Sequence, residues 1–169
     1  QIPVFFINNE LLTKDSSLNI SFITNVNQIR SAENVIGFIP GKTDELLVIS
    51  AHYDHIGYDR GQICNGADDD GSGTVALLSL AKAFQKAFSE GKTPQRGILF
   101  LMVSGEEKGL FGSKFYTDYP AFPLSKTIAN LNIDMIGRKD TIKTNNNYIY
   151  LIGSDKISKD LHTINEQIN

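Results

Sequence analysis

Cysteine is almost absent from this sequence: Cys64 is the only one in 169 residues. A single thiol excludes an internal disulfide framework and does not indicate a cellular compartment, and we expect Cys64 to be a loop thiol without a role. Long apolar runs are also lacking. None approaches the length of a membrane span, and the first residues lack the charged and apolar regions of a signal peptide. The formal net charge of -3 provides no basic surface, which argues against nucleic acid as a partner.

The composition is that of a globular protein, with 41% hydrophobic and 21% charged residues. A chain of this length can bury a substantial core but is too short for two ordinary domains. We therefore expect residues 1–169 to form a single domain.

The hydrophobic pattern predicts strands that alternate with helices. An apolar/polar alternation over 18–30, followed by the turn-like "SAE" and an apolar segment, predicts a β-hairpin. Helices are expected over 73–88, in the latter part of 105–119, and over 155–168 with Asp155 or Ser154 as its cap. This order favours an α/β fold in which a mixed, mostly parallel sheet lies between two helical layers. The expected strands are 2–7, 18–30, 34–41, 45–54, 96–104, 127–137 and 147–154.

Histidine is scarce too, and two of the three histidines, His52 and His55, lie at the end of the apolar run 45–54. Acidic residues gather at three further places where an apolar segment ends: "NGADDDGSG" (65–73), "SGEEKG" (104–109) and "NIDMIG" (132–137). Carboxylates near a core are costly unless they bind a metal, a cation or hydrogen-bond donors. Lys108 and Arg138 are the only cations close to these clusters in the sequence, so a shared metal site is the economical interpretation. Histidine and carboxylate ligands favour zinc, with manganese or cobalt as alternatives.

Each cluster also has a simpler explanation when it is taken alone. "HYDH" suits local hydrogen bonding in a loop, and "DDDGSG" suits a solvated turn before a helix N-terminus, where acids are favourable. Paired glutamates are common on helix surfaces, whereas an aspartate inside the apolar run of "NIDMIG" needs a partner. The metal site is the better interpretation because all four clusters occur together, each at the end of a predicted strand. His162 lies in a polar amphipathic segment and is expected to be a surface or packing residue.

The ordered motifs resemble the co-catalytic zinc aminopeptidases of metallopeptidase family twenty-eight, of the secreted bacterial leucyl-aminopeptidase type. They are "AHYDH" (51–55), "NGADDDGSG", "SGEEKGLFGSKFY" (104–116) and "LNIDMIGR" (131–138), within a resemblance that covers residues 34–154. The resemblance implies the three-layer αβα zinc exopeptidase fold. "IPVFFINNELL" (2–12) is loosely similar to the segment that follows an inserted protease-associated domain, so residues 1–17 would be the end of such an insert.

The resemblance also implies metal ligands. His52 and Asp134 would bind one zinc, Asp69 would bridge two zinc ions, and Glu107 would bind the second. In the family the peptide bond that follows the bridging aspartate is cis, which here is the bond between Asp69 and Asp70.

Two further roles follow from the same resemblance. Asp54 would orient the His52 imidazole through its other ring nitrogen. Glu106 would be the general base, taking a proton from a zinc-activated water and delivering it to the leaving amine. His55 would make local hydrogen bonds, since His52 already fills the ligand position.

The family pattern includes a further histidine, for the second zinc, well downstream of the "IDMIG" motif. After Asp134 this sequence has only His162, and no residue matches that position. We therefore expect the fold to lack its C-terminal part. The chain alone should bind at most one zinc firmly, have little or no aminopeptidase activity, and cover exposed apolar surface by self-association.

The expected function is that of a secreted or periplasmic metallo-aminopeptidase, which hydrolyses the N-terminal peptide bond of a peptide substrate and uses two zinc ions when complete. One alternative is a glutaminyl-cyclase-like zinc acyltransferase, but such enzymes use one zinc and lack the "DDDGSG" form. Another is a non-catalytic domain of the same fold. Such relatives lose ligand carboxylates, whereas all those expected within this stretch are present.

Overall fold

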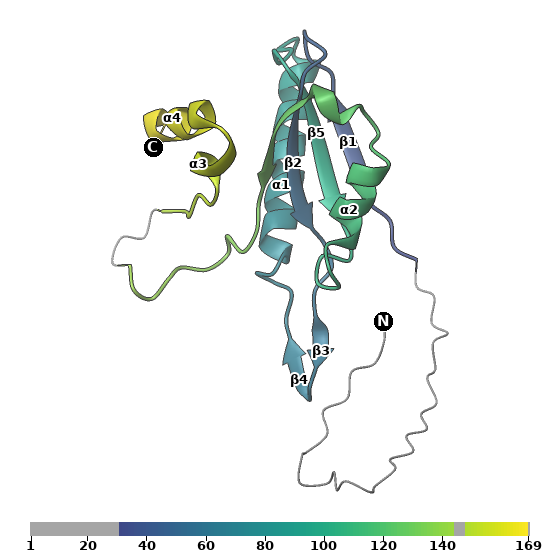
Figure 1. Ribbon diagram of the computed structural model, residues 1–169, viewed down its shortest axis with the longest axis vertical. Coiled ribbons are helices and arrows are strands. Elements are labelled where there is room, and N and C mark those ends of the chain that lie inside the picture. Colours follow the sequence, from purple (N-terminus) through teal and green to yellow (C-terminus); the bar gives the residue numbers. More distant parts are fainter. Residues whose placement is uncertain (1–30, 144–147, 169) are drawn as a thin grey trace, which may run out of the picture. The chain divides into compact units, whose positions relative to one another are not determined.

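The computed structural model describes residues 31–143 and 148–168 (Figure 1). The chain divides into two units, Gln1–Ser31 and Ala32–Asn169, and the second contains all the helices and strands described. The strands expected over 2–7 and 18–30, the hairpin and the inserted segment over 1–17 lie outside the described residues.

The centre of the second unit is a mixed four-stranded sheet with the strand order β1-β5-β2-β6. Strand β2 pairs in parallel with both β5 and β6, and β1 is antiparallel to β5. The predicted α/β fold with a mostly parallel sheet is thereby confirmed. The strands are β1 (Val35–Ile39), β2 (Leu46–His52), β5 (Gly97–Val103) and β6 (Thr127–Asn132).

A helix covers each face of the sheet. On one face, Leu77 of α1 (Gly71–Ser89) packs in a core cluster with residues such as Ile49 and Phe100. On the other, Tyr116 of α2 (Phe111–Asp118) packs with residues such as Val48 and Leu99. Neighbouring residues of β2 and β5 thus enter opposite clusters, because successive side chains of a strand point to opposite faces. This explains why both strands are continuous apolar runs, and it confirms the three-layer arrangement.

A small antiparallel hairpin, β3 (Gly57–Asp59) with β4 (Gln62–Cys64), extends from the chain between β2 and α1 (Figure 1). Arg60 and Gly61 link the strands with φ of 46° and 85°, as a type I′ turn requires. This hairpin was not predicted from the sequence because "RG" is a weaker turn signal than "NG" or "DG".

Two predictions near the C-terminal end were wrong. No strand is present over 148–153, and Ile149 and Ile152 are exposed, since an apolar segment becomes a strand only where a neighbour pairs with it. The helix expected over 155–168 is two helices, α3 (Ser154–Ile157) and α4 (Lys159–Ile168). Ser158 between them is extended, and its Oγ accepts the N–H of Leu161 at 3.1 Å, so it caps the second helix. No helix within the described ranges is long and apolar enough to cross a membrane.

The contact of α1 with the sheet gives a stability prediction. Leu77→Ala is expected to lower the free energy of unfolding by about 2–5 kcal/mol, because the side chain is 1% exposed and its loss leaves a cavity. Urea unfolding of the two proteins measures this difference. Leu78→Ala is the matched control. Leu78 is the next residue on the same helix but is 49% exposed, so its substitution should lower the free energy of unfolding much less. Equal losses would contradict this packing.

Candidate metal and catalytic site

The predicted site residues lie where strands of the sheet end. His52 is the last residue of β2, Asp134 lies two residues beyond β6, and Glu106 follows β5. Because these three strands are parallel, their carboxyl ends lie at the same edge of the sheet. Asp69 approaches the same edge from the turn that precedes α1.

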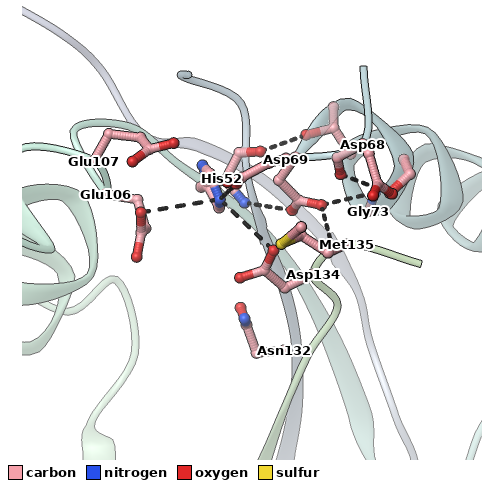
Figure 2. A network of polar contacts seen from close by, with 12 residues as sticks. His52, Asp68, Asp69, Gly73, Glu106, Glu107, Asn132, Asp134 and Met135 are labelled. Atoms are coloured by element: carbon pink, nitrogen blue, oxygen red, sulfur yellow. Dashed lines mark hydrogen bonds and ion pairs between the residues drawn. The ribbon is translucent and has the colours of Figure 1, made fainter. Parts of the chain in front are cut away.

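Three of the predicted ligands come together around His52 Nε2 (Figure 2). This atom lies 3.2 Å from Asp69 Oδ1 and 3.9 Å from Asp134 Oδ1. One donor atom from each of the three residues lies within 4.8 Å of the others, a grouping able to hold a metal ion. The Glu106 carboxylate is adjacent, with Oε2 at 4.0 Å from the same nitrogen. Three of the four residues expected to bind metal, His52, Asp69 and Asp134, thus come together, whereas Glu107, the fourth, does not join this grouping.

The surroundings of His52 fix its tautomer. Its side chain is 2% exposed, and Nδ1 lies 3.0 Å from the backbone carbonyl oxygen of Asp54. A carbonyl only accepts, so Nδ1 carries the proton of the neutral ring, and the Nε2 lone pair is free to face Asp69 and Asp134. Nε2 is buried and makes no hydrogen bond. An imidazole nitrogen left without a partner beside two carboxylates fits a metal ligand, so the donor set suits zinc.

Asp54 acts differently from the expectation in one respect. The residue does lie on the Nδ1 side of His52, but its carbonyl is the closer partner, since its carboxylate Oδ1 is 3.6 Å away. The carboxylate instead accepts the backbone N–H groups of Glu106 at 3.2 Å and Glu107 at 3.3 Å. Asp54 therefore links the end of β2 to the turn that carries both glutamates.

The two glutamates have different environments. Glu106 lines a cavity of about 350 Å³, which is also lined by His52 and Asp134 and extends between β2, β5, β6 and α2. Glu107 lies outside the group of three converging donors, and its Oε1 is buried without a hydrogen-bond partner. Burial, together with the nearby charges of Asp69 and Glu106, raises the pKa of Glu107.

The site concentrates negative charge around one imidazole. Burial lowers the pKa of His52, but the charges of Asp70, Glu106 and Asp134 outweigh it, so the pKa is raised overall. Burial also raises the pKa of Asp70, although the hydrogen bonds that it accepts from backbone N–H groups act to lower this pKa. A divalent cation would relieve this repulsion, which agrees with the chemistry of the donor set.

Two residues beside Asp69 were not predicted from the sequence to take part in the site. Asp70 is 1% exposed and Asp68 is 7% exposed, and both accept backbone N–H groups near the site. The run of three aspartates was a visible signal, but a sequence does not show which carboxylate faces the cluster. The Asp69–Asp70 peptide bond is cis, as the resemblance implied.

The remaining histidines lie outside the cluster. His55 is exposed in the loop after β2. His162 is exposed on α4, where its Nδ1 lies 3.3 Å from Ser154 Oγ. Neither joins a metal-binding grouping among the described residues. The exposure of His162 agrees with the surface position expected for it, and the local hydrogen bonding expected of His55 stays a prediction.

Comparison with known proteins gives a consistent result. The model of peptidase family M28 matches residues 34–168. Aminopeptidase YwaD of Bacillus subtilis is 31% identical over 145 residues, which is 80% of this chain and 29% of that protein. The chain spans 11% or less of the vacuolar membrane proteases that it also matches.

Solved structures agree on the fold. An aminopeptidase from Aneurinibacillus sp. strain AM-1 superimposes with a TM-score of 0.53 at 28% identity, over 63% of this chain and 25% of that one. A glutaminyl cyclase of Bacteroides thetaiotaomicron gives a TM-score of 0.52 at 21% identity, over 62% of this chain and 41% of that one. At that identity the second likeness shows a shared fold and does not distinguish between reactions.

Proposed function

The chain belongs to peptidase family M28, and from this premise we propose that it carries a zinc-binding and general-base site of an aminopeptidase. The observation that carries the proposal is the convergence of Asp69 and Asp134 on a buried, unpartnered His52 Nε2, with Glu106 beside it. The likeness to aminopeptidase YwaD and to the Aneurinibacillus aminopeptidase supports the choice of reaction.

The proposed ligands of one zinc are His52, Asp69 and Asp134. A zinc ion held by them would supply Lewis acidity toward the scissile carbonyl and lower the pKa of a nearby water. Glu106 lines the cavity beside this cluster, and its carboxylate would accept a proton from that water and later donate it to the leaving amine. The carbonyl of Asp54 holds the imidazole in the tautomer that leaves Nε2 free.

The proposed holders of a second zinc are Glu107 and Asp69, of which Asp69 would take part in both sites. The unpartnered, buried Oε1 of Glu107 supports that role. Among the described residues no further histidine lies beside Glu107 in a metal-binding grouping. We therefore infer that the 169-residue chain by itself holds at most one zinc firmly and has little or no aminopeptidase activity.

Metal removal tests the proposal on the full-length protein that contains this chain. Chelation should abolish the release of amino acids from aminoacyl-nitroanilides, and added zinc should restore it, because the carboxylates and His52 cannot polarise the substrate alone. The measurements are zinc content and nitroaniline release, with an N-acetylated substrate as the control that an aminopeptidase does not cleave.

The same preparation separates the alternatives. Cyclisation of peptides that begin with glutamine, without amino-acid release, would contradict the proposal in favour of a glutaminyl-cyclase-like enzyme. Zinc binding with neither activity would favour a non-catalytic domain. Activity that survives complete metal removal would reject the zinc site itself.

A further inference from the structure

The three consecutive aspartates of "DDD" have different partners, although they are adjacent in the sequence. Asp69, in the middle, contributes to the metal-binding grouping with His52 and Asp134. The carboxylates of Asp68 and Asp70 accept backbone N–H groups from other segments. The side chains of Asp68 and Asp70 therefore bind the backbone around the metal-binding grouping.

Asp70 connects three segments that meet at the site. Its Oδ2 accepts the N–H of His52 at 3.2 Å, and its Oδ1 accepts those of Gly73 at 2.9 Å and Met135 at 3.3 Å. A β-carbon at Gly73 would lie 2.4 Å from Asp70 Oδ1 and 2.5 Å from the Ile133 carbonyl oxygen. Only glycine at this position allows the helix start, the carboxylate and the loop after β6 to approach so closely.

Asp68 holds the same loop two residues further on. Its Oδ1 accepts the N–H of Gly137 at 2.7 Å. Ser72 Oγ donates to the Asp68 carbonyl oxygen at 2.8 Å and accepts the N–H of Ile136 at 3.1 Å. A β-carbon at Gly137 would lie 2.7 Å from Asp68 Oδ1, so this contact is equally close.

The N–H groups of three successive residues, 135 to 137, are thus bound by side chains from the turn before α1 and from the first turn of this helix. Met135 has a φ of 50°, a left-handed conformation that is uncommon outside glycine. This turn comes directly after Asp134, and the bonds to the following amides therefore fix the backbone from which the Asp134 carboxylate extends.

We propose that Asp70 and Asp68 are positioning residues, which fix the loop 133–138 against α1 and thereby hold Asp134 beside His52 and Asp69. The inference rests on the proposed zinc site for its metal-binding consequence. A purely structural role as the N-cap of α1 would need only the bond from Gly73 to Asp70. The bonds to His52 and Met135 join the segments that carry two of the three ligands, and they go beyond what a cap requires.

Zinc affinity of the full-length protein tests the inference, by competition with a chromophoric chelator. Asp70→Ser keeps a side chain that caps the helix but is too short to reach His52 and Met135. Asp68→Ala removes the acceptor for Gly137. Each is expected to weaken zinc binding by about 10–100-fold, the usual effect of removing a residue that supports a ligand. The absorption spectrum of the cobalt-loaded protein should change as well, because Asp134 shifts.

Matched variants separate positioning from charge. Asp68→Asn retains an oxygen for the Gly137 N–H and should stay close to the wild type. Asp118→Ala removes an exposed carboxylate on α2 that pairs with Lys114, and this variant should bind zinc with the wild-type affinity. Hydrogen exchange of the metal-free protein supplies a second measurement. The segment 133–138 should exchange faster in Asp70→Ser and Asp68→Ala than in the wild type.

Unchanged zinc affinity in both variants, even with lower thermal stability, would overturn the inference and leave the proposed reaction standing. A protein that binds zinc but releases no amino acids would reject the reaction and leave the inference standing. If Asp70→Ser does not fold, the comparison of Asp68→Ala with Asp68→Asn decides, and equal affinities in that pair would overturn the role of Asp68 as a hydrogen-bond acceptor.

Discussion

Glu106→Gln is expected to lower kcat by about 10²–10⁴-fold, the typical contribution of a general base, while zinc content stays at the wild-type level. The carboxylate of Glu106 lines the cavity beside the cluster, but it is not one of the three converging donors. Glutamine has nearly the same shape and cannot take up the proton. The backbone N–H of this residue would still donate to Asp54, so the turn should keep its conformation. Steady-state kinetics on an aminoacyl-nitroanilide and metal analysis of the same sample measure the two quantities.

Glu107→Gln provides the comparison within the same turn. Glu107 is half-buried, and one of its carboxylate oxygens, Oε1, is buried without a hydrogen-bond partner, which suits a ligand of a second metal ion. In the full-length protein this variant should lose metal at that second site, and Glu90→Gln, at the exposed end of α1, should behave like the wild type. Equal metal loss in Glu106→Gln and Glu107→Gln would show that the two roles are assigned the wrong way round.

The fold was predictable where burial left a direct mark on the sequence. Residues 45–54 and 96–104 are continuous apolar runs because β2 and β5 are covered on both faces. The segment 148–153 has a similar apolar pattern but forms no strand. Pairing depends on a neighbouring strand distant in sequence, and a local pattern does not contain that information.

For the site, the sequence predicted which side chains meet but not the hydrogen bonds that hold them. Side chains that follow parallel strands must meet at one edge, so the convergence of His52 and Asp134 follows from the order of strands and motifs. The contacts of Asp54 did not follow, because its carbonyl and its carboxylate have different partners. The contacts of Asp68 and Asp70 could not be predicted either, because their partners are backbone N–H groups, which every residue except proline possesses.

His52→Asn should have the largest effect on metal binding. Removal of a residue that merely supports a ligand costs about 10–100-fold in affinity, so the loss of the ligand itself should exceed about 100-fold. Asparagine can still donate to the Asp54 carbonyl from the position of Nδ1, but it has no atom where Nε2 lies. The ring is 2% exposed, so some loss of stability will accompany the substitution.

His55→Asn is the control for this prediction. His55 is exposed in the loop after β2, three residues beyond His52, and lies outside the metal-binding grouping, so zinc affinity and turnover should remain at the wild-type level. Zinc titration and far-ultraviolet circular dichroism of both variants separate the loss of a ligand from the loss of the fold. Undiminished zinc affinity in a folded His52→Asn protein would mean that the carboxylates bind the metal without the imidazole. The unpartnered Nε2, on which the proposed zinc site depends most, would then have to be explained by packing alone.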